Sequence, residues 1–239
     1  MKIIKAEKLQ QKPDFSKLVF GRAHTDYILE MDYRGGAWGE PVIKPYEDFK
    51  MSPMSMCLHY GQGIFEGCKA FRNDKGEVTL FRIMDNLKRM NRSAYRMCMP
   101  QFDEAVVFEA LVELIKIERD WVPTLPGTAL YLRPTMIATE VALGVHVSKE
   151  YKFFIVLSPV GAYIRSDGET AKINIEDKYV RAAKGGTGEA KCMGNYAGGL
   201  LAQYEAAQKG FHQVLWLDAA EHKYIEGVGT MNVMFVIDG

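Results

Sequence analysis

Apolar and polar residues follow two kinds of pattern along the chain, and the first kind predicts strands. Residues 27–33 alternate as a half-buried strand does, and the runs 68–72 and 77–81 flank Asn73-Asp74-Lys75-Gly76 as the arms of a hairpin. Other short apolar runs predict further strands at 129–132, 153–157, 172–175, 214–217 and 232–237.

The second pattern is the three- and four-residue spacing of an amphipathic helix. Asp85 is predicted to cap a first helix that Pro100 ends, and Asp103 to cap a second one. A third helix is expected over 195–209, with Gly210 just beyond its end. The positions expected to face inward are Leu87, Met90, Ala94 and Met97, then Val107, Leu111, Leu114 and Ile115, and finally Leu200, Leu201 and Tyr204.

This mixture of elements predicts an α+β protein with two domains. We expect a small N-terminal domain at 1–160, a polar, turn-rich linker at 161–170, and a second domain at 171–239. The second domain would have only about 70 residues, which is small for a separate core. We therefore expect the chain to be the front part of a longer protein.

Composition narrows the functional class. The 239 residues are 48% apolar and 25% charged, with 30 basic and 30 acidic side chains, so the formal net charge is zero. Such a chain folds, and it has no electrostatic reason to bind nucleic acid or an anionic membrane. No leader or membrane-spanning run is visible, and the four cysteines and five histidines lack metal-ligand spacing. We predict a reduced, cytoplasmic protein without a metal site.

One glycine-rich loop carries the strongest chemical signal. Gly185-Gly186-Thr187-Gly188 precedes Lys191, but Cys192 stands where a phosphate-binding P-loop needs Ser or Thr. The P-loop interpretation is therefore poor, and the loop taken alone favours a flexible turn with a solvated lysine. A lysine held away from bulk water beside Tyr196 would instead suit Schiff-base chemistry, because desolvation lowers the pKa of its amine.

Further motifs occur in order from about Phe20 to the last residue. They are 58–67 (LHYGQGIFEG), 69–71, 80–82, 89–90, 93–94, 131–134, 161–163, 185–188 with Lys191, 194–196 (GNY) and 228–232 (VGTMN). Together they resemble the branched-chain aminotransferases, which are pyridoxal 5'-phosphate enzymes of fold type IV. The resemblance implies that fold, with a small N-terminal domain and a larger cofactor-binding domain that is incomplete here.

The resemblance also implies a role for each matching residue. Lys191 would form the Schiff base with pyridoxal 5'-phosphate. The residues that would hold this cofactor are Arg89 at its phosphate, Tyr196 at its ring hydroxyl, and Arg181, Glu226, Gly229 and Thr230. The residues that would line the substrate pocket are Phe20, Tyr60, Phe65, Tyr131, Arg133 and Tyr163, with Leu143 and Val145 on a loop from the other subunit of a homodimer.

The implied activity is transfer of the amino group of leucine, isoleucine or valine to 2-oxoglutarate. It would proceed through the cofactor–lysine Schiff base in a ping-pong sequence that yields glutamate. Two alternatives share the fold, a D-amino-acid transaminase and an aminodeoxychorismate lyase. A third alternative is a non-catalytic, truncated homologue that only binds.

Two positions depart from the family pattern. Relatives carry the carboxylate that faces the pyridine nitrogen five residues before the position of Asn232, where this chain has Gly227. Glu226 lies one residue earlier, and a β-bulge permitted by the glycine would be needed to turn it inward. Met193 replaces a glycine beside the lysine loop. Impaired turnover is therefore expected.

Overall fold

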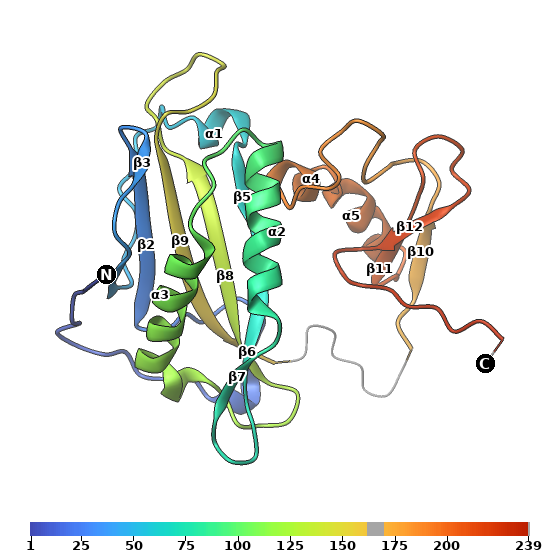
Figure 1. Cartoon of the computed structure of the whole chain (residues 1–239). Helices are drawn as coiled ribbons and strands as arrows, with labels where there is room; N and C mark the ends of the chain where they lie inside the picture. Colours follow the sequence, from blue (N-terminus) through green and yellow to red (C-terminus); the bar gives the residue numbers. More distant parts are fainter. Residues whose placement is uncertain (162–169, 239) are drawn as a thin grey trace. The chain divides into compact units, whose positions relative to one another are not determined.

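The structure, a computed structural model, describes residues 1–161 and 170–238 and divides into two compact units (Figure 1). Unit 1 is Met1–Ile164 and unit 2 is Arg165–Gly239. The division falls within the predicted linker, most of which lies outside the described residues. The proposed limits of the two domains remain a prediction.

Unit 1 is built on a nine-stranded sheet with the order β1-β4-β2-β9-β8-β6-β7, in which β3 pairs with β2 and β5 with β8. All pairs are antiparallel except β1 with β4. The strands are β1 (Lys2–Ile3), β2 (Tyr27–Arg34), β3 (Ala37–Trp38), β4 (Val42–Pro45), β5 (Gly63–Phe65), β6 (Cys68–Arg72), β7 (Val78–Leu80), β8 (Ala129–Ala138) and β9 (Tyr151–Val160).

The strands predicted in this unit are confirmed, including the hairpin formed by β6 and β7. The last two strands are longer than predicted, at ten residues each. β8 continues through Pro134, which lies between the stretch paired with β6 and the stretch paired with β5. A proline has no N–H to donate to a continuous ladder of hydrogen bonds, so it is tolerated where the strand changes its partner.

The helices of this unit are α1 (Cys57–Tyr60), α2 (Ile83–Arg96) and α3 (Glu104–Ile117), with 3-10 turns at Phe15–Lys17 and Arg119–Trp121. The predicted cap of α3 is confirmed, because the Asp103 carboxylate accepts hydrogen bonds from two backbone N–H groups of the first turn. The predicted cap of α2 is wrong. Asp85 lies inside the first turn, where a carboxylate also interacts favourably with the helix dipole, and it pairs with the capping residue Arg82 at 2.6 Å.

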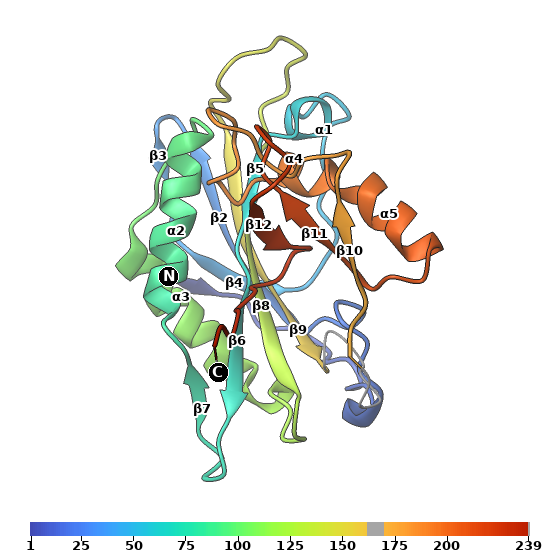
Figure 2. The same cartoon turned by 90° about the vertical axis from the view of Figure 1, so that its right-hand side faces the viewer.

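The two long helices lie along one face of the sheet (Figures 1 and 2). Alternate side chains of β8 and β9 are fully buried toward them, and Phe102, just before α3, contacts Phe153 with ring centroids 5.2 Å apart. The core residues of β8 and β9 on this face include Leu130, Leu132, Met136, Phe153, Ile155 and Leu157. Side chains of the intervening positions, such as Tyr131 and Arg133, therefore point to the opposite face.

Unit 2 has a smaller sheet in which β10 (Ile173–Glu176) runs parallel to β11 (Gln213–Leu217), and β11 runs antiparallel to β12 (Ile225–Val228). Its helices are α4 (Met193–Ala197) and α5 (Leu200–Gln208). The core of this unit consists of Ala202, Ala206, Val214 and Trp216, against which Tyr179 and Phe211 pack. The predicted strands near 172 and 214 are confirmed.

Two predictions for unit 2 are wrong. The helix expected over 195–209 is interrupted at Gly198 and Gly199, and its alanines face the core. The three residues expected to face inward are 51–63% exposed, namely Leu200, Leu201 and Tyr204. The reason is the volume of Trp216, since a Cβ on Gly199 would already lie 3.3 Å from its ring.

The second error is the strand expected over 232–237. The structure has no strand there, and the large apolar side chains of this segment are exposed. An apolar run forms a strand only where another strand offers its backbone hydrogen bonds, and none of the described strands does so.

Candidate functional site

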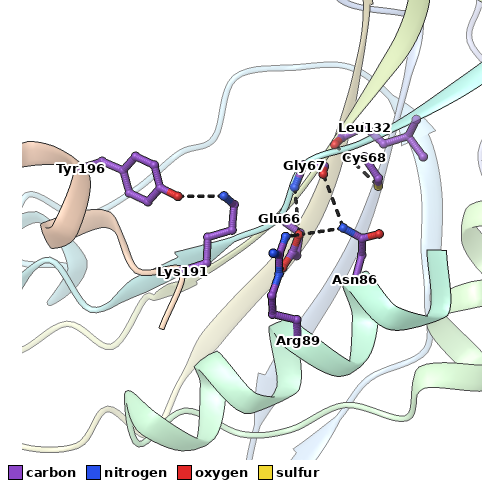
Figure 3. Close-up of polar contacts among 8 residues, drawn as sticks. All are labelled: Glu66, Gly67, Cys68, Asn86, Arg89, Leu132, Lys191 and Tyr196. Carbon is purple, nitrogen blue, oxygen red and sulfur yellow. Dashed lines mark hydrogen bonds and ion pairs between the residues drawn. The ribbon is translucent and has the colours of Figure 1, made fainter. Parts of the chain in front are cut away.

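Lys191 lies in unit 2, immediately before the N-cap of α4, and its amine faces a phenol on that helix. Lys191 Nζ donates a hydrogen bond to Tyr196 Oη at 2.8 Å (Figure 3). The amine also lies 5.2 Å from the centre of the tyrosine ring, and both side chains are half-buried. This arrangement differs from that of a solvated lysine on a turn, because the polar aromatic partner holds the amine.

Asn195 closes the glycine-rich loop that leads to this lysine. Its Nδ2 donates to the carbonyls of Thr187 at 2.7 Å and Ala190 at 2.8 Å, and its Oδ1 accepts from Thr187 Oγ1 at 2.7 Å. Sequence reasoning assigned no role to Asn195. The available signal was its place between the loop and Tyr196 in the GNY motif.

The glycines of the loop bring the backbone close to another part of the same unit. A Cβ on Gly188 would lie 2.5 Å from the Cβ of Ala182 and 4.0 Å from Nη2 of Arg181. Arg181, predicted to lie near the cofactor, is therefore packed beside the loop that precedes Lys191. Only glycine permits this approach.

The segment after β12 contains two more predicted cofactor residues. Gly229 has a φ of +50°, and its N–H donates to the carbonyl of Val214 at 2.6 Å. A Cβ there would overlap the amide of Gln213, so the turn requires glycine. Thr230 follows and is exposed.

A register shift of the β-bulge type, which Glu226 would need in order to turn inward, lies at this residue. Trp216 on β11 pairs with Gly227 and Leu217 pairs with Ile225, which leaves Glu226 as the extra residue on β12. Its side chain is exposed, whereas Gly227 is half-buried. The bulge shifts the alternation of side chains at the point where the family pattern and this chain differ.

Arg89 lies in unit 1 on α2 and forms a side-on ion pair with Glu66. Arg89 Nε lies 2.6 Å from Glu66 Oε1, and Arg89 Nη2 lies 2.8 Å from Glu66 Oε2 (Figure 3). Sequence reasoning missed Glu66. The signal for it was a single acidic residue at the end of an apolar run, but its partner is 23 residues away.

The thiol of Cys68 lies near this pair and is not a candidate nucleophile. Burial, and then the negative charge of Glu66, raises the pKa of the Cys68 thiol to about 12. The thiol therefore stays protonated at neutral pH, and a protonated thiol is a poor nucleophile.

Four predicted substrate residues come together in unit 1 on the face of the sheet opposite the helices. The guanidinium of Arg133 lies 4.7 Å from the ring centre of Phe65 and 5.2 Å from that of Tyr131. Arg133 Nη2 donates to Tyr131 Oη at 2.9 Å, and Phe20 meets the Tyr131 ring edge-on at 4.9 Å. Arg133 Nε is buried and has no hydrogen-bond partner among the described residues. The cluster thus combines aromatic walls with one cationic group.

The remaining predicted residues form a separate contact or lie outside the description. Tyr60, at the end of α1, donates from its hydroxyl to the carbonyl of Leu143. Leu143 and Val145 lie on the same exposed loop, with Val145 83% exposed. Tyr163 lies outside the described residues.

Metal clusters and membrane spans are both absent from the described ranges, 1–161 and 170–238. No group of three or more His, Cys, Asp or Glu side chains there has the geometry to hold a metal ion. No helix in those ranges combines the length and the apolar character needed to cross a membrane.

Comparison with known proteins gives consistent matches. The model of the family "Amino-transferase class IV" matches residues 63–239. The "Branched-chain-amino-acid transaminase 1" of Bacillus subtilis (strain 168) is 53% identical over 243 residues, which cover 100% of this chain and 68% of that protein.

Solved structures give the same result. The branched-chain amino acid aminotransferase of Escherichia coli aligns with a TM-score of 0.67 and 26% identity, over 85% of this chain and 62% of that one. A second branched-chain amino acid aminotransferase, from T.th. and solved with pyridoxamine 5'-phosphate, aligns with a TM-score of 0.65 and 27% identity, over 83% and 62%. The chain thus spans about two thirds of the length of the proteins it matches.

Proposed function

This chain belongs to the class IV aminotransferase family, and from that membership we propose that it is a branched-chain-amino-acid transaminase dependent on pyridoxal 5'-phosphate. We infer that it moves the amino group of leucine, isoleucine or valine to 2-oxoglutarate in a ping-pong sequence. The observation that carries the proposal is the hydrogen bond from Lys191 Nζ to Tyr196 Oη, because it presents a primary amine beside a polar aromatic group.

The donors present fit such a cofactor chemically. The phosphate needs a fixed cation, for which Arg89 offers a planar fork of N–H donors. The aldehyde needs an amine, which is Lys191, and the ring hydroxyl needs a polar neighbour, which is Tyr196. When bound, pyridoxal 5'-phosphate supplies the aldehyde and an electron-withdrawing ring. Arg181, Glu226, Gly229 and Thr230 are proposed as further contacts.

Lys191 has two proposed tasks. The first is to join the aldehyde of the cofactor, and the second is to transfer a proton. With the cofactor held at this site, the Lys191 amine would carry a proton between the substrate Cα and the cofactor carbon that bears the transferred nitrogen, first as a base and then as an acid. Tyr196 Oη, as the acceptor of the hydrogen bond from Nζ, keeps the amine in a defined position. The Asn195 bonds hold the loop that precedes this lysine.

The cluster around Arg133 supports both substrates of the proposed cycle. Its aromatic rings suit a leucine, isoleucine or valine side chain, whose burial contributes roughly 1.5–3 kcal/mol. The buried Nε of Arg133 suits the distal carboxylate of 2-oxoglutarate or glutamate, which would supply its missing partner. Tyr60, Tyr163, Leu143 and Val145 are proposed as further pocket residues, the last two from the second subunit of a cytoplasmic homodimer.

Gly227 favours a second candidate function, that of a homologue which binds the cofactor without efficient turnover. No carboxylate is available at this position, and Glu226 on the bulge is exposed. A weakly held ring proton would slow the steps that need the ring as an electron sink.

A spectroscopic titration of the purified chain tests the proposal. Pyridoxal 5'-phosphate should produce a visible absorbance band as it joins Lys191, L-leucine should remove the band, and 2-oxoglutarate should then restore it. D-leucine serves as the matched control and should leave the band unchanged. A response to D-amino acids alone would favour the D-amino-acid transaminase, and a stable band with no response to any amino acid would favour the binding-only homologue.

Gly67 offers a test of the proposed substrate cluster. A Cβ on Gly67 would lie 2.1 Å from Tyr131 Oη, so the Gly67→Ala variant has to displace the phenol and with it the hydrogen bond from Arg133. We expect kcat/KM for 2-oxoglutarate to fall about tenfold to a hundredfold, the scale of one or two lost polar contacts. Steady-state kinetics measure the effect.

Gly76→Ala is the matched control, because Gly76 lies in the β6–β7 hairpin and an added Cβ there meets no atom within 4 Å. Because Gly76 has a positive φ, an added Cβ strains the backbone of this control. The thermal transitions of both variants are therefore measured beside the kinetics, and kcat/KM is compared at equal fractions of folded protein. An unchanged kcat/KM in Gly67→Ala would remove the cluster from the proposed pocket.

A further inference from the structure

We propose that Glu66 is a positioning residue that sets the orientation of the Arg89 guanidinium toward the phosphate of the cofactor. The inference rests on the proposed function, in which Arg89 binds that phosphate. It adds a residue for which neither the motifs nor the family resemblance provided a role.

Glu66 is enclosed by donors. Its side chain is fully buried, at 0% exposure. Oε1 accepts from Arg89 Nε at 2.6 Å, and Oε2 accepts from Arg89 Nη2 at 2.8 Å, from Asn86 Nδ2 at 3.1 Å and from the N–H of Gly67 at 3.2 Å (Figure 3). A buried carboxylate is tolerated only with such a complete set of partners, and the set leaves it a single orientation.

The pair is strongly asymmetric in its exposure. The Arg89 side chain is 45% exposed, whereas its partner is inaccessible. A pair that served only to fill the interior would bury both groups. Here the buried carboxylate grips the guanidinium along its Nε–Nη2 edge, which fixes the plane of the group and turns its Nη1 end away from Glu66. The pair thereby fixes the direction in which the Nη1 end of the half-exposed Arg89 side chain points.

The backbone around Glu66 explains how the position is held. Its N–H donates to the carbonyl of Pro134 on β8 at 2.8 Å, so the residue is tied to the central part of the sheet. Phe65 and Gly67 serve the Arg133 cluster on one face, while the Glu66 side chain points to α2 on the other. Adjacent residues of an extended segment alternate in this way, so one short segment supports both sets of side chains.

The distinguishing property is selectivity for phosphate. A structural tie between the sheet and α2 would affect every ligand equally. A positioning role affects only a ligand that carries the phosphate. The experiment therefore compares the dissociation constants of the full chain for pyridoxal 5'-phosphate and for pyridoxal, which lacks the phosphate, by absorbance titration.

In Glu66→Gln, an amide nitrogen faces one of the guanidinium N–H groups, so the side-on pair cannot form. We expect the dissociation constant for pyridoxal 5'-phosphate to rise about tenfold to a hundredfold and that for pyridoxal to change less than about twofold. Glu47→Gln is the matched control. It removes the exposed acid of another 2.6 Å ion pair, whose partner is Lys44, and the ratio should not change.

A double-mutant cycle shows whether Glu66 acts through the arginine. In the Arg89→Gln background, Glu66→Gln should have no further effect on the ratio of the two dissociation constants. Where Glu66→Gln does not fold, as judged by its thermal transition, Asn86→Ala decides. That variant removes one donor from Oε2 and should lower the phosphate preference by a smaller factor, about threefold to tenfold.

Equal weakening of both ligands, an unchanged ratio, or an additive effect in the Arg89→Gln background would each overturn the proposal. Failure of the proposed function is distinguishable. In that case the unmodified chain itself would fail to bind pyridoxal 5'-phosphate covalently, and the positioning role would fall with it.

Discussion

Replacing Lys191 with alanine is expected to abolish transamination, with a fall in kcat of at least about ten-thousandfold. The variant loses the amine that joins the cofactor and the base that moves the proton at the substrate Cα, and removal of a group with both tasks has effects of this size. Since a methyl group cannot accept or donate a proton, Tyr196 cannot compensate. Stopped-flow absorbance with L-leucine measures the effect.

The matched control is Lys184→Ala, because Lys184 is an exposed lysine seven positions earlier in the same loop region. It should retain full activity. Added methylamine should restore part of the rate in Lys191→Ala, because a small free amine can act where the side chain is missing. A Lys191→Ala variant that retained the visible band, or more than about a tenth of the rate, would assign the chemistry to another amine.

The sequence predicted elements well where neighbours along the chain determine them. Alternation located β2, and a short apolar run located β9. Asp103 marked the start of α3, because a capping carboxylate bonds N–H groups two and three residues away. Prediction from the sequence failed where a residue distant along the chain determines which face of an element is buried. The buried face of α5 is set by the indole of Trp216, which selects Ala202 and Ala206 rather than the larger leucines nearby.

The candidate site divides in the same way. Lys191 and Tyr196 are five residues apart, so the short stretch that contains both already indicated their proximity. The meeting of Phe20 with Tyr131 depends on the path of the sheet, and only the family resemblance suggested it. Glu66 was missed because its role depends on Arg89 on α2. No local pattern connects that helix to an acidic residue at the end of an apolar run.

Restoring a carboxylate by Gly227→Glu is expected to raise kcat about a hundredfold to a thousandfold. The structure accommodates the change, because a Cβ at Gly227 meets no atom within 4 Å and the residue already pairs with Trp216 in the sheet. A fixed negative charge that holds the proton on the pyridine nitrogen strengthens the withdrawal of electrons, and single electrostatic groups of this kind contribute on that scale.

A neutral isostere separates the effect of the charge from the effect of the added side chain. Gly227→Gln has nearly the same size and the same gain in backbone order as Gly227→Glu, so it should leave kcat unchanged if charge is the cause. Glu226→Gln in the unmodified chain measures the alternative, in which the bulge lets Glu226 supply the charge. A large loss there, with no gain from Gly227→Glu, would mean that the bulge has already moved the carboxylate by one residue. No gain from Gly227→Glu and no loss from Glu226→Gln would favour the homologue that binds without turnover.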